Sequence, residues 1–403
     1  MEWDPTTVNP LYGHQAGTVV GYHPHQPGLP SQRTKALMTM TDNISRRTFL
    51  KRTGSVLAVS AIGFPHISIP QSKEKLGVAL VGLGSYSTGR LASGLQQTEY
   101  CELRGIVTGS PEKIPVWQER YGIPDGNVYH YENMHDIANN DAIDIVYIVL
   151  PTGLHAEYSM IGAEAGKHVW CEKPMAMNVE ECQQMIDVAN KNNVSLAIGY
   201  RLHHEPNTRK IMQFAREATY GPVREVRTAA GYDGYHEDGN WRKNPDLGGG
   251  ALYDMGVYPI NAIRYATQME PIAVNGRQST VRKDVYPEVD EITDFELEFA
   301  NGMVCVGETS FGKSMNYLNI NTENGWYYLK PMSSYSGVQG RTSDGTALSA
   351  DPGHQQARQM DNEALAIKEK RPPIVPASQG LHDIRIVKAI MESSKRGQTR
   401  VEL

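Results

Sequence analysis

Residues 76–87 read LGVALVGLGSYS, an apolar run that leads directly into a glycine turn. The first six residues predict a short buried strand, and a helix is expected to follow the turn. Gly82 permits the tight turn, and Gly84 lets the backbone approach a pyrophosphate, which the free N–H groups at the helix start would bind. Ser87 stands at the third fingerprint position in place of glycine. The stretch therefore predicts a dinucleotide site at the start of an α/β domain.

Beyond the turn, apolar runs alternate with helical stretches, which is typical of βαβ units and a parallel sheet. A second strand, expected at about 102–107, ends where a carboxylate would bind the ribose 2′-hydroxyl of NAD. The sequence continues instead with two hydroxyls and a cation, at Thr108, Ser110 and Lys113. Because these groups could receive a 2′-phosphate, NADP is favoured over NAD.

Two later strands are expected to bring polar groups to the same edge of the sheet. The central strand stops at Pro151, and His155 follows it, either beside the cofactor crevice or as a helix cap. The next strand ends in the charged pair Glu172-Lys173. Ligands of doubly wound sheets bind beyond the carboxyl ends of the strands, so we expect this pair to be functional.

Three motifs resemble the family of glucose-fructose oxidoreductase and inositol dehydrogenase. They are EKP at 172–174, AIGYR at 197–201 and GGGALYDMGVY at 248–258, and the likeness extends from Leu76 to Leu403. It implies an α/β fold with an NAD(P)-binding Rossmann domain at 75–198 that contains a doubly wound parallel sheet. It also implies an α+β substrate domain at 199–378 with a large, open, mostly antiparallel sheet.

The C-terminal half carries patterns that agree with this resemblance. Residues 295–299 read FELEF, the alternation of a half-buried strand, and Asn301-Gly302 is a two-residue hairpin turn. A helix within 379–403 is expected to pack back on the first domain. In the family the broad face of the sheet mediates subunit association, so the resemblance implies a homodimer or homotetramer.

The resemblance also implies the site residues. Lys173, Asp254 and Tyr258 would be catalytic. From their place at the crossover between the domains, we also expect Tyr200 and His203 to line the sugar site with Tyr258. The cofactor would be surrounded by Gly82, Gly84, Ser85, Tyr86, Ser87, Thr108, Lys113, Tyr131, Leu150, Pro151, His155, Glu172, Lys173, Arg201, Trp241 and Arg242. No metal is expected, because the pair His203-His204 has no third ligand at a suitable spacing.

Asp254 and Tyr258 are four residues apart in a helix expected from about 251 to 267, so both can point at one substrate. Oxidation of a sugar carbinol needs a base for the hydroxyl proton, and a phenol is a poor base because its pKa is about 10. The ammonium of Lys173 is therefore expected to lower the pKa of Tyr258 and to offset charge on the reacting oxygen. Asp254 would orient the sugar or the lysine.

Residues 1–74 are expected to contain a targeting signal instead of a folded domain. The segment SRRTFLK at 45–51, followed by a weakly apolar stretch at 54–64, predicts a twin-arginine export signal and thus a periplasmic or exported protein that meets the export machinery. The stretch is shorter than the ~20 residues needed to span a bilayer. Residues 1–37 are expected to be disordered. Twin-arginine export delivers folded proteins to a compartment without free nicotinamide, so the cofactor is expected to stay bound.

Charge and composition narrow the choice of partner. The 403 residues carry a net charge of -6, which provides no basic surface for nucleic acid and favours small neutral molecules such as sugars. The leading hypothesis is an oxidoreductase with tightly bound NADP that oxidises one sugar to a lactone and reduces another. The alternatives are an NAD(P)-dependent sugar or polyol dehydrogenase with exchangeable cofactor, an NAD-dependent glycoside hydrolase, and a sugar-binding protein without turnover.

Overall fold

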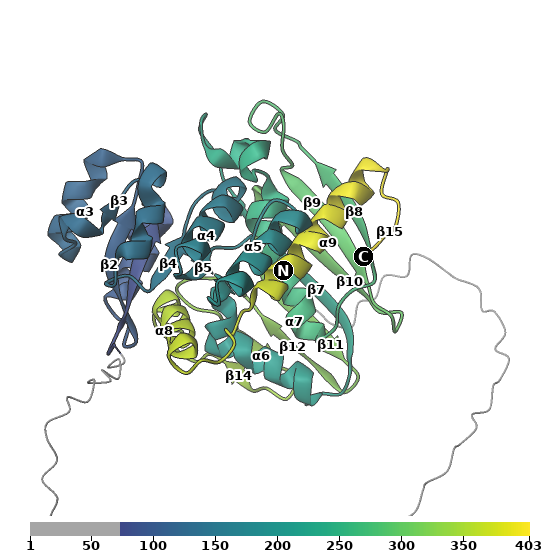
Figure 1. The fold of residues 1–403 in the computed structure, drawn as a ribbon. Coiled ribbons are helices and arrows are strands. Elements are labelled where there is room, and N and C mark those ends of the chain that lie inside the picture. Colours follow the sequence, from purple (N-terminus) through teal and green to yellow (C-terminus); the bar gives the residue numbers. More distant parts are fainter. Residues whose placement is uncertain (1–72) are drawn as a thin grey trace, which may run out of the picture. The chain divides into compact units, whose positions relative to one another are not determined.

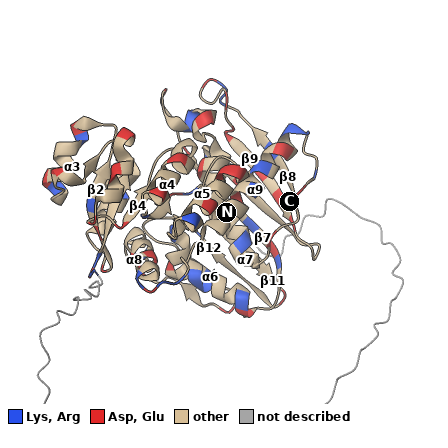
Figure 2. Cartoon of the chain, viewed as in Figure 1, with Lys and Arg blue, Asp and Glu red and all other residues tan. Residues whose placement is uncertain are grey.

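The computed structural model describes residues 73–403, and the predicted export signal at 45–64 lies outside them. Two sheets form the framework of this part of the chain, with helices packed on both (Figure 1). None of the helices among residues 73–403 is long and apolar enough to cross a membrane. Positive and negative side chains are mixed along the helices in the view of Figure 2.

The first sheet contains six parallel strands in the order β3-β2-β1-β4-β5-β6. This order winds outward in both directions from the neighbours β1 and β4, as in a dinucleotide-binding fold, so the predicted parallel doubly wound sheet is confirmed. The strands are β1 (Leu76–Val81), β2 (Cys101–Val107), β3 (Val128–Tyr129), β4 (Ile145–Ile148), β5 (His168–Cys171) and β6 (Leu196–Ile198).

Helices cover both faces of this sheet. The helices α4 (His155–Glu164), α5 (Val179–Lys191) and α9 (Ala377–Lys395) share the core of one face, and α2 (Ala92–Leu95), α3 (Ile114–Tyr121) and α8 (Gln355–Lys368) cover the other. Within residues 199–378, α8 returns to the first domain, where its Met360 and Ala364 pack with Tyr147 and Trp170. Local sequence patterns do not reveal such a return of the chain, because the contacts join segments about 200 residues apart.

The second sheet has nine strands in the order β14-β13-β12-β11-β7-β10-β9-β8-β15, and all neighbouring pairs are antiparallel except β7 with β10. This arrangement confirms the expected large, mostly antiparallel sheet. The strands are β7 (Val223–Asp233), β8 (Ala273–Ser279), β9 (Ile292–Glu298), β10 (Val304–Ser310), β11 (Gly312–Thr322), β12 (Gly325–Leu329), β13 (Gly340–Thr342), β14 (Ala347–Leu348) and β15 (Val401–Glu402).

The sheet is built as its sequence pattern predicts. Phe295 and Leu297 are buried while Glu296 between them is exposed, and Asn301-Gly302 forms the turn between β9 and β10. The helices α6 (Pro206–Glu217), α7 (Val257–Thr267) and α9 pack on strands of this sheet. The C-terminal helix α9 also contacts α5 and β6, so it bridges the two domains instead of packing on the first alone.

Candidate active site

A cavity of about 580 Å³ lies beyond the carboxyl ends of β1, β4 and β5, where a doubly wound sheet binds its ligand. A helical segment of the second domain forms the opposite wall. This segment is the π-helical turn η9 (Leu252–Gly256), which runs directly into α7. Single π turns inside longer helices occur frequently at functional sites. The cavity thus lies between the glycine turn and the helix that the sequence predicts to be catalytic.

The glycine turn has the geometry that a phosphate cradle requires. Gly82 has a φ of +94°, and a β-carbon there would lie 2.5 Å from the carbonyl oxygen of Val149. A β-carbon on Gly84 would meet open space, so this backbone is free to approach a ligand. Ser87 does not line the cavity, but its hydroxyl donates to the Gly82 oxygen at 2.6 Å and holds the turn. These residues fit the pyrophosphate of a dinucleotide at the start of a helix.

The end of β2 supplies the groups expected for a 2′-phosphate. Thr108, Ser110 and Lys113 all line the cavity. The Lys113 ammonium donates to the Leu83 oxygen at 3.1 Å, which places this cation beside the glycine turn. Tyr131 also lines this end. Two hydroxyls and an ammonium form a donor set suited to a phosphate group.

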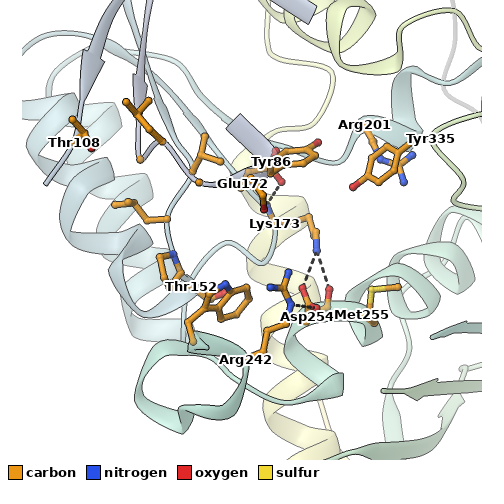
Figure 3. A pocket seen from close by; sticks show the side chains of 18 of the residues that line it. Tyr86, Thr108, Thr152, Glu172, Lys173, Arg201, Arg242, Asp254, Met255 and Tyr335 are labelled. Atoms are coloured by element: carbon orange, nitrogen blue, oxygen red, sulfur yellow. Dashed lines mark hydrogen bonds and ion pairs between the residues drawn. The ribbon is translucent and has the colours of Figure 1, made fainter. Parts of the chain in front are cut away.

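Lys173, Asp254 and Tyr258 all line the cavity, and Figure 3 shows the Lys173 side chain pointing toward Asp254. The Lys173 ammonium donates to the Asp254 backbone oxygen at 2.8 Å and lies 3.9 Å from Asp254 Oδ1. The same ammonium is 4.8 Å from the centre of the Tyr258 ring. Arg242 donates from Nε to Asp254 Oδ2 at 2.7 Å, and Trp241 lies beside it at the cavity. The strand end and the helical face that the sequence pairs are therefore in contact.

Neighbouring charges and burial determine the protonation states of Asp254 and Tyr258. Although burial raises the pKa of Asp254, the cations of Arg242 and Lys173 outweigh burial and hold this pKa below its usual value. Asp254 is thus a carboxylate at neutral pH. Burial also raises the pKa of Tyr258, and this effect exceeds the opposing effect of Arg201. The prediction that the pKa of Tyr258 is lowered was therefore wrong in sign, because Lys173 lies over the ring while burial penalises the phenolate.

Glu172 connects the site to the sheet through a buried hydrogen bond. Its carboxylate is buried, accepts from the Tyr147 hydroxyl at 2.7 Å, and has a pKa that burial raises. Gln359 of α8 donates to the same hydroxyl at 2.8 Å. A β-carbon on Gly199 would lie 2.7 Å from Glu172 Oε1, so the AIGYR motif leaves room for this carboxylate.

Three residues expected at the site lie behind its walls. His155 is buried and does not line the cavity: one ring nitrogen contacts the Leu150 oxygen at 2.8 Å and the other contacts the Pro174 oxygen at 2.7 Å. It ties together the chain segments after β4 and β5, which is neither of the roles predicted for it. Tyr200 and His203 are also away from the cavity, and His203 Nε2 pairs with Asn261 Oδ1 of α7 at 2.8 Å.

Several residues that line the cavity are not among the predicted site residues: Leu83, Val149, Thr152, Tyr232, Met255, Ser333 and Tyr335. Leu83 and Met255 lie within the quoted motifs, whereas no local pattern marks Tyr232, Ser333 and Tyr335. Tyr232 comes from β7, and its hydroxyl lies 3.4 Å from Asp254 Oδ2 and 2.8 Å from His236 Nε2. Tyr335 comes from the loop after β12. The predicted residues that do line the cavity are Gly82, Gly84, Ser85, Tyr86, Thr108, Lys113, Tyr131, Leu150, Pro151, Glu172, Lys173, Arg201, Trp241, Arg242, Asp254 and Tyr258.

Comparison with known proteins places this geometry among oxidoreductases. A family model described as "Oxidoreductase family, NAD-binding Rossmann fold" matches residues 76–200, and the GFO/IDH/MocA C-terminal domain matches 208–328. The crystal structure of the aldose-aldose oxidoreductase from Caulobacter crescentus, complexed with glycerol, is 36% identical with a TM-score of 0.78. That match covers 82% of this chain and 100% of the other.

Two further relatives have NADP in their descriptions. The D-xylose 1-dehydrogenase [NADP(+)] of Haloarcula marismortui is 28% identical over 337 residues, which is 80% of this chain and 91% of that protein. The structure of a 3-ketoreductase from Actinomadura kijaniata in complex with NADP and TDP-benzene is 21% identical with a TM-score of 0.70, covering 79% of this chain and 97% of the other. The latter supports the fold.

Proposed function

Because the chain belongs to the GFO/IDH/MocA family of oxidoreductases, we propose that it is an NADP-dependent sugar oxidoreductase that oxidises one aldose and reduces a second sugar on the same bound cofactor. The observation that carries the proposal is the contact of Lys173 with Asp254 and Tyr258 in a cavity that also contains the glycine turn. Two relatives support it: the D-xylose 1-dehydrogenase is named for NADP(+) and an aldose, and the other relative is named an aldose-aldose oxidoreductase.

When bound, NADP would accept a hydride from a sugar carbinol, and the NADPH so formed would donate it to a sugar carbonyl. Around the reacting oxygen, Lys173 offers an ammonium that stabilises negative charge, and Asp254 offers a carboxylate that accepts from sugar hydroxyls. Tyr258 accepts the proton of the sugar hydroxyl in the oxidation and donates a proton to the sugar carbonyl oxygen in the reduction. In the oxidation, C1 of the aldose loses a hydride and O1 loses a proton, which yields a lactone. In the reduction, the second sugar carbonyl gains both and becomes an alcohol.

The raised pKa of Tyr258 suits this alternation. As a phenol at neutral pH, Tyr258 is ready to donate its proton in the reductive half-reaction. The phenolate left behind is then the base that the next aldose hydroxyl requires. The pair of reactions releases no net proton, whereas oxidation of a single sugar with external NADP releases one.

The test is a reaction without added cofactor. Purified protein would be mixed with pairs of aldoses and ketoses, and the products would be separated by chromatography. Equal amounts of lactone and sugar alcohol support the proposal. A protein that carries no stoichiometric nicotinamide after purification, and makes no product until NADP is added, contradicts it.

The second candidate is a sugar dehydrogenase with exchangeable cofactor, which the similarity to a D-xylose 1-dehydrogenase favours. It differs in one observable. Steady formation of NADPH from one sugar and external NADP, without a second sugar, would select the dehydrogenase.

We further propose export by the twin-arginine route and assembly into a homodimer or homotetramer through the second sheet. The sequence SRRTFLK at 45–51 supports export, and the broad nine-stranded sheet, which resembles the sheet that mediates subunit association in the family, supports assembly. Replacement of both Arg46 and Arg47 by Lys is expected to keep the protein in the cytoplasm, as measured by cell fractionation. Light scattering measures the oligomer, and a monomer would contradict the assembly.

A further inference from the structure

The loop between β12 and β13 reaches from the second sheet to the first domain at the cavity. The centre of its Tyr335 ring lies 4.2 Å from the guanidinium carbon of Arg201 and 4.7 Å from that of Arg90. Arg90 belongs to η1 (Ser87–Leu91), directly after the glycine turn, and Arg201 begins η6 (Arg201–His204). Arg90 of the first domain and Arg201 of the segment that follows β6 thus both contact one aromatic ring of the second sheet's loop, and each cation is attracted to the negative face of that ring.

Hydrogen bonds fix the loop in this position. Asn316 Oδ1 accepts from the backbone N–H of Ser333 at 3.0 Å, and the Ser333 oxygen accepts from the Arg201 guanidinium. Gln355, the first residue of α8, donates to the Ser334 oxygen at 2.8 Å and accepts from Arg201. Asn316 therefore holds the loop to β11 of the second sheet, while Gln355 holds it to α8, which packs on the first domain.

Tyr335 forms part of the cavity wall. It is 36% exposed, so its side chain is accessible to a molecule that enters the cavity. Its ring lies 6.2 Å from the ring of Tyr86, which belongs to the glycine turn. Tyr335 and Arg201 lie together beside the space above Lys173 (Figure 3). Tyr86 and Tyr335 would therefore cover a dinucleotide bound at the glycine turn.

We propose that the Arg90–Tyr335–Arg201 stack is a clasp that retains the dinucleotide between the two half-reactions. This inference rests on the proposed function, because only a reaction cycle on one bound cofactor requires a residence time much longer than a turnover. Retention by the clasp makes the opening of this loop, and not the glycine turn alone, the step that limits release. Entry of the cofactor is slowed by the same contacts.

The experiment compares rates of cofactor release. Wild type, Tyr335→Ala, Tyr335→Phe and Arg90→Gln would each be loaded with NADPH and diluted into excess NADP, with release followed by the fluorescence of bound NADPH. Tyr235→Ala is the matched control, because Tyr235 is 66% exposed and does not line the cavity. We expect Tyr335→Ala to release NADPH at least about tenfold faster, as the loss of two cation–aromatic contacts predicts.

The other variants sharpen the result. Tyr335→Phe keeps the ring between the guanidinium groups and should remain near wild type, and Arg90→Gln should be intermediate. Release from Tyr335→Ala at the wild-type rate overturns the clasp. If that variant does not fold, an unchanged rate for Arg90→Gln overturns it instead, since Arg90 is an exposed residue. A wild type that loses NADPH on dialysis defeats the bound-cofactor function, but the ratio of release rates still decides the clasp.

Discussion

Replacement of Lys173 by Met removes the ammonium at the centre of the site while it keeps most of the side-chain volume. The ammonium contacts the Asp254 backbone oxygen at 2.8 Å, and the Lys173 side chain is 14% exposed, so it acts in a partly desolvated environment. A unit charge about 4 Å from a developing oxyanion contributes about 4 kcal/mol at an effective dielectric constant of about 20. Loss of one such donor typically lowers kcat by about 10²–10³-fold. We expect a fall of about 10³-fold in hydride transfer.

The assay is single-turnover reduction of bound NADP by an aldose, followed by the absorbance of NADPH. Arg242 lies 2.7 Å from Asp254, so we expect the carboxylate to stay paired in the variant and the fold to persist. Lys313→Met is the matched control, because Lys313 pairs with Glu308 on the second sheet and is 54% exposed. A Lys173→Met protein that binds NADPH normally and reacts within about tenfold of wild type would refute the assigned role of the ammonium.

Three other predictions test separate parts of the account. Tyr258→Phe should lower the rates of both half-reactions by about 10²–10⁴-fold. In wild type the oxidative half-reaction should accelerate as pH rises, because burial raises the pKa of Tyr258 and the phenolate is scarce at neutral pH. A rate that does not change with pH in stopped-flow measurements would argue against Tyr258 as the base. Lys113→Met should weaken NADP binding by about 10–100-fold with little effect on NAD binding, because a charge-assisted hydrogen bond contributes about 1.5–3 kcal/mol. Titration with both nucleotides measures the two affinities. An equal loss of affinity for NADP and NAD would exclude a contact between Lys113 and the 2′-phosphate. Glu363→Gln should change the pH dependence of stability. Burial raises the pKa of Glu363 from 4.5 to about 7. Because the folded state holds this proton more tightly than the unfolded state, the unfolding free energy of wild type falls by up to about 3 kcal/mol as pH rises from about 4.5 to about 7. The variant's gain in unfolding free energy over wild type should grow across this range in urea titrations, and a constant difference would show that Glu363 is ionised.

The sequence predicts those features of the site that depend on local chain geometry. The turn at Gly82 and Gly84 and the charged pair after β5 follow from strand-to-loop patterns, and the topology of a doubly wound sheet brings these edges together. The four-residue spacing of Asp254 and Tyr258 predicts their common face, because they lie on one continuous helical segment. These residues line the cavity as expected.

The features that the sequence does not predict depend on contacts between distant segments. Tyr232 and Tyr335 reach the cavity from a strand and a loop of the second sheet, and no local pattern marks them. The pKa of Tyr258 depends on burial, which spacing along a helix does not reveal. The sequence places His155 and His203 at the site, but both are buried behind it, where their ring nitrogens lie within hydrogen-bond distance of backbone and amide oxygens.

The most direct test follows the hydride itself. Purified protein, without added nicotinamide, would be incubated with an aldose deuterated at its anomeric carbon and with a second, unlabelled sugar. If one bound cofactor passes the hydride from sugar to sugar, mass spectrometry will find one deuterium in each molecule of sugar alcohol, in equal amount to the lactone. Sugar alcohol without deuterium, or no sugar alcohol until NADP is supplied, would contradict the account.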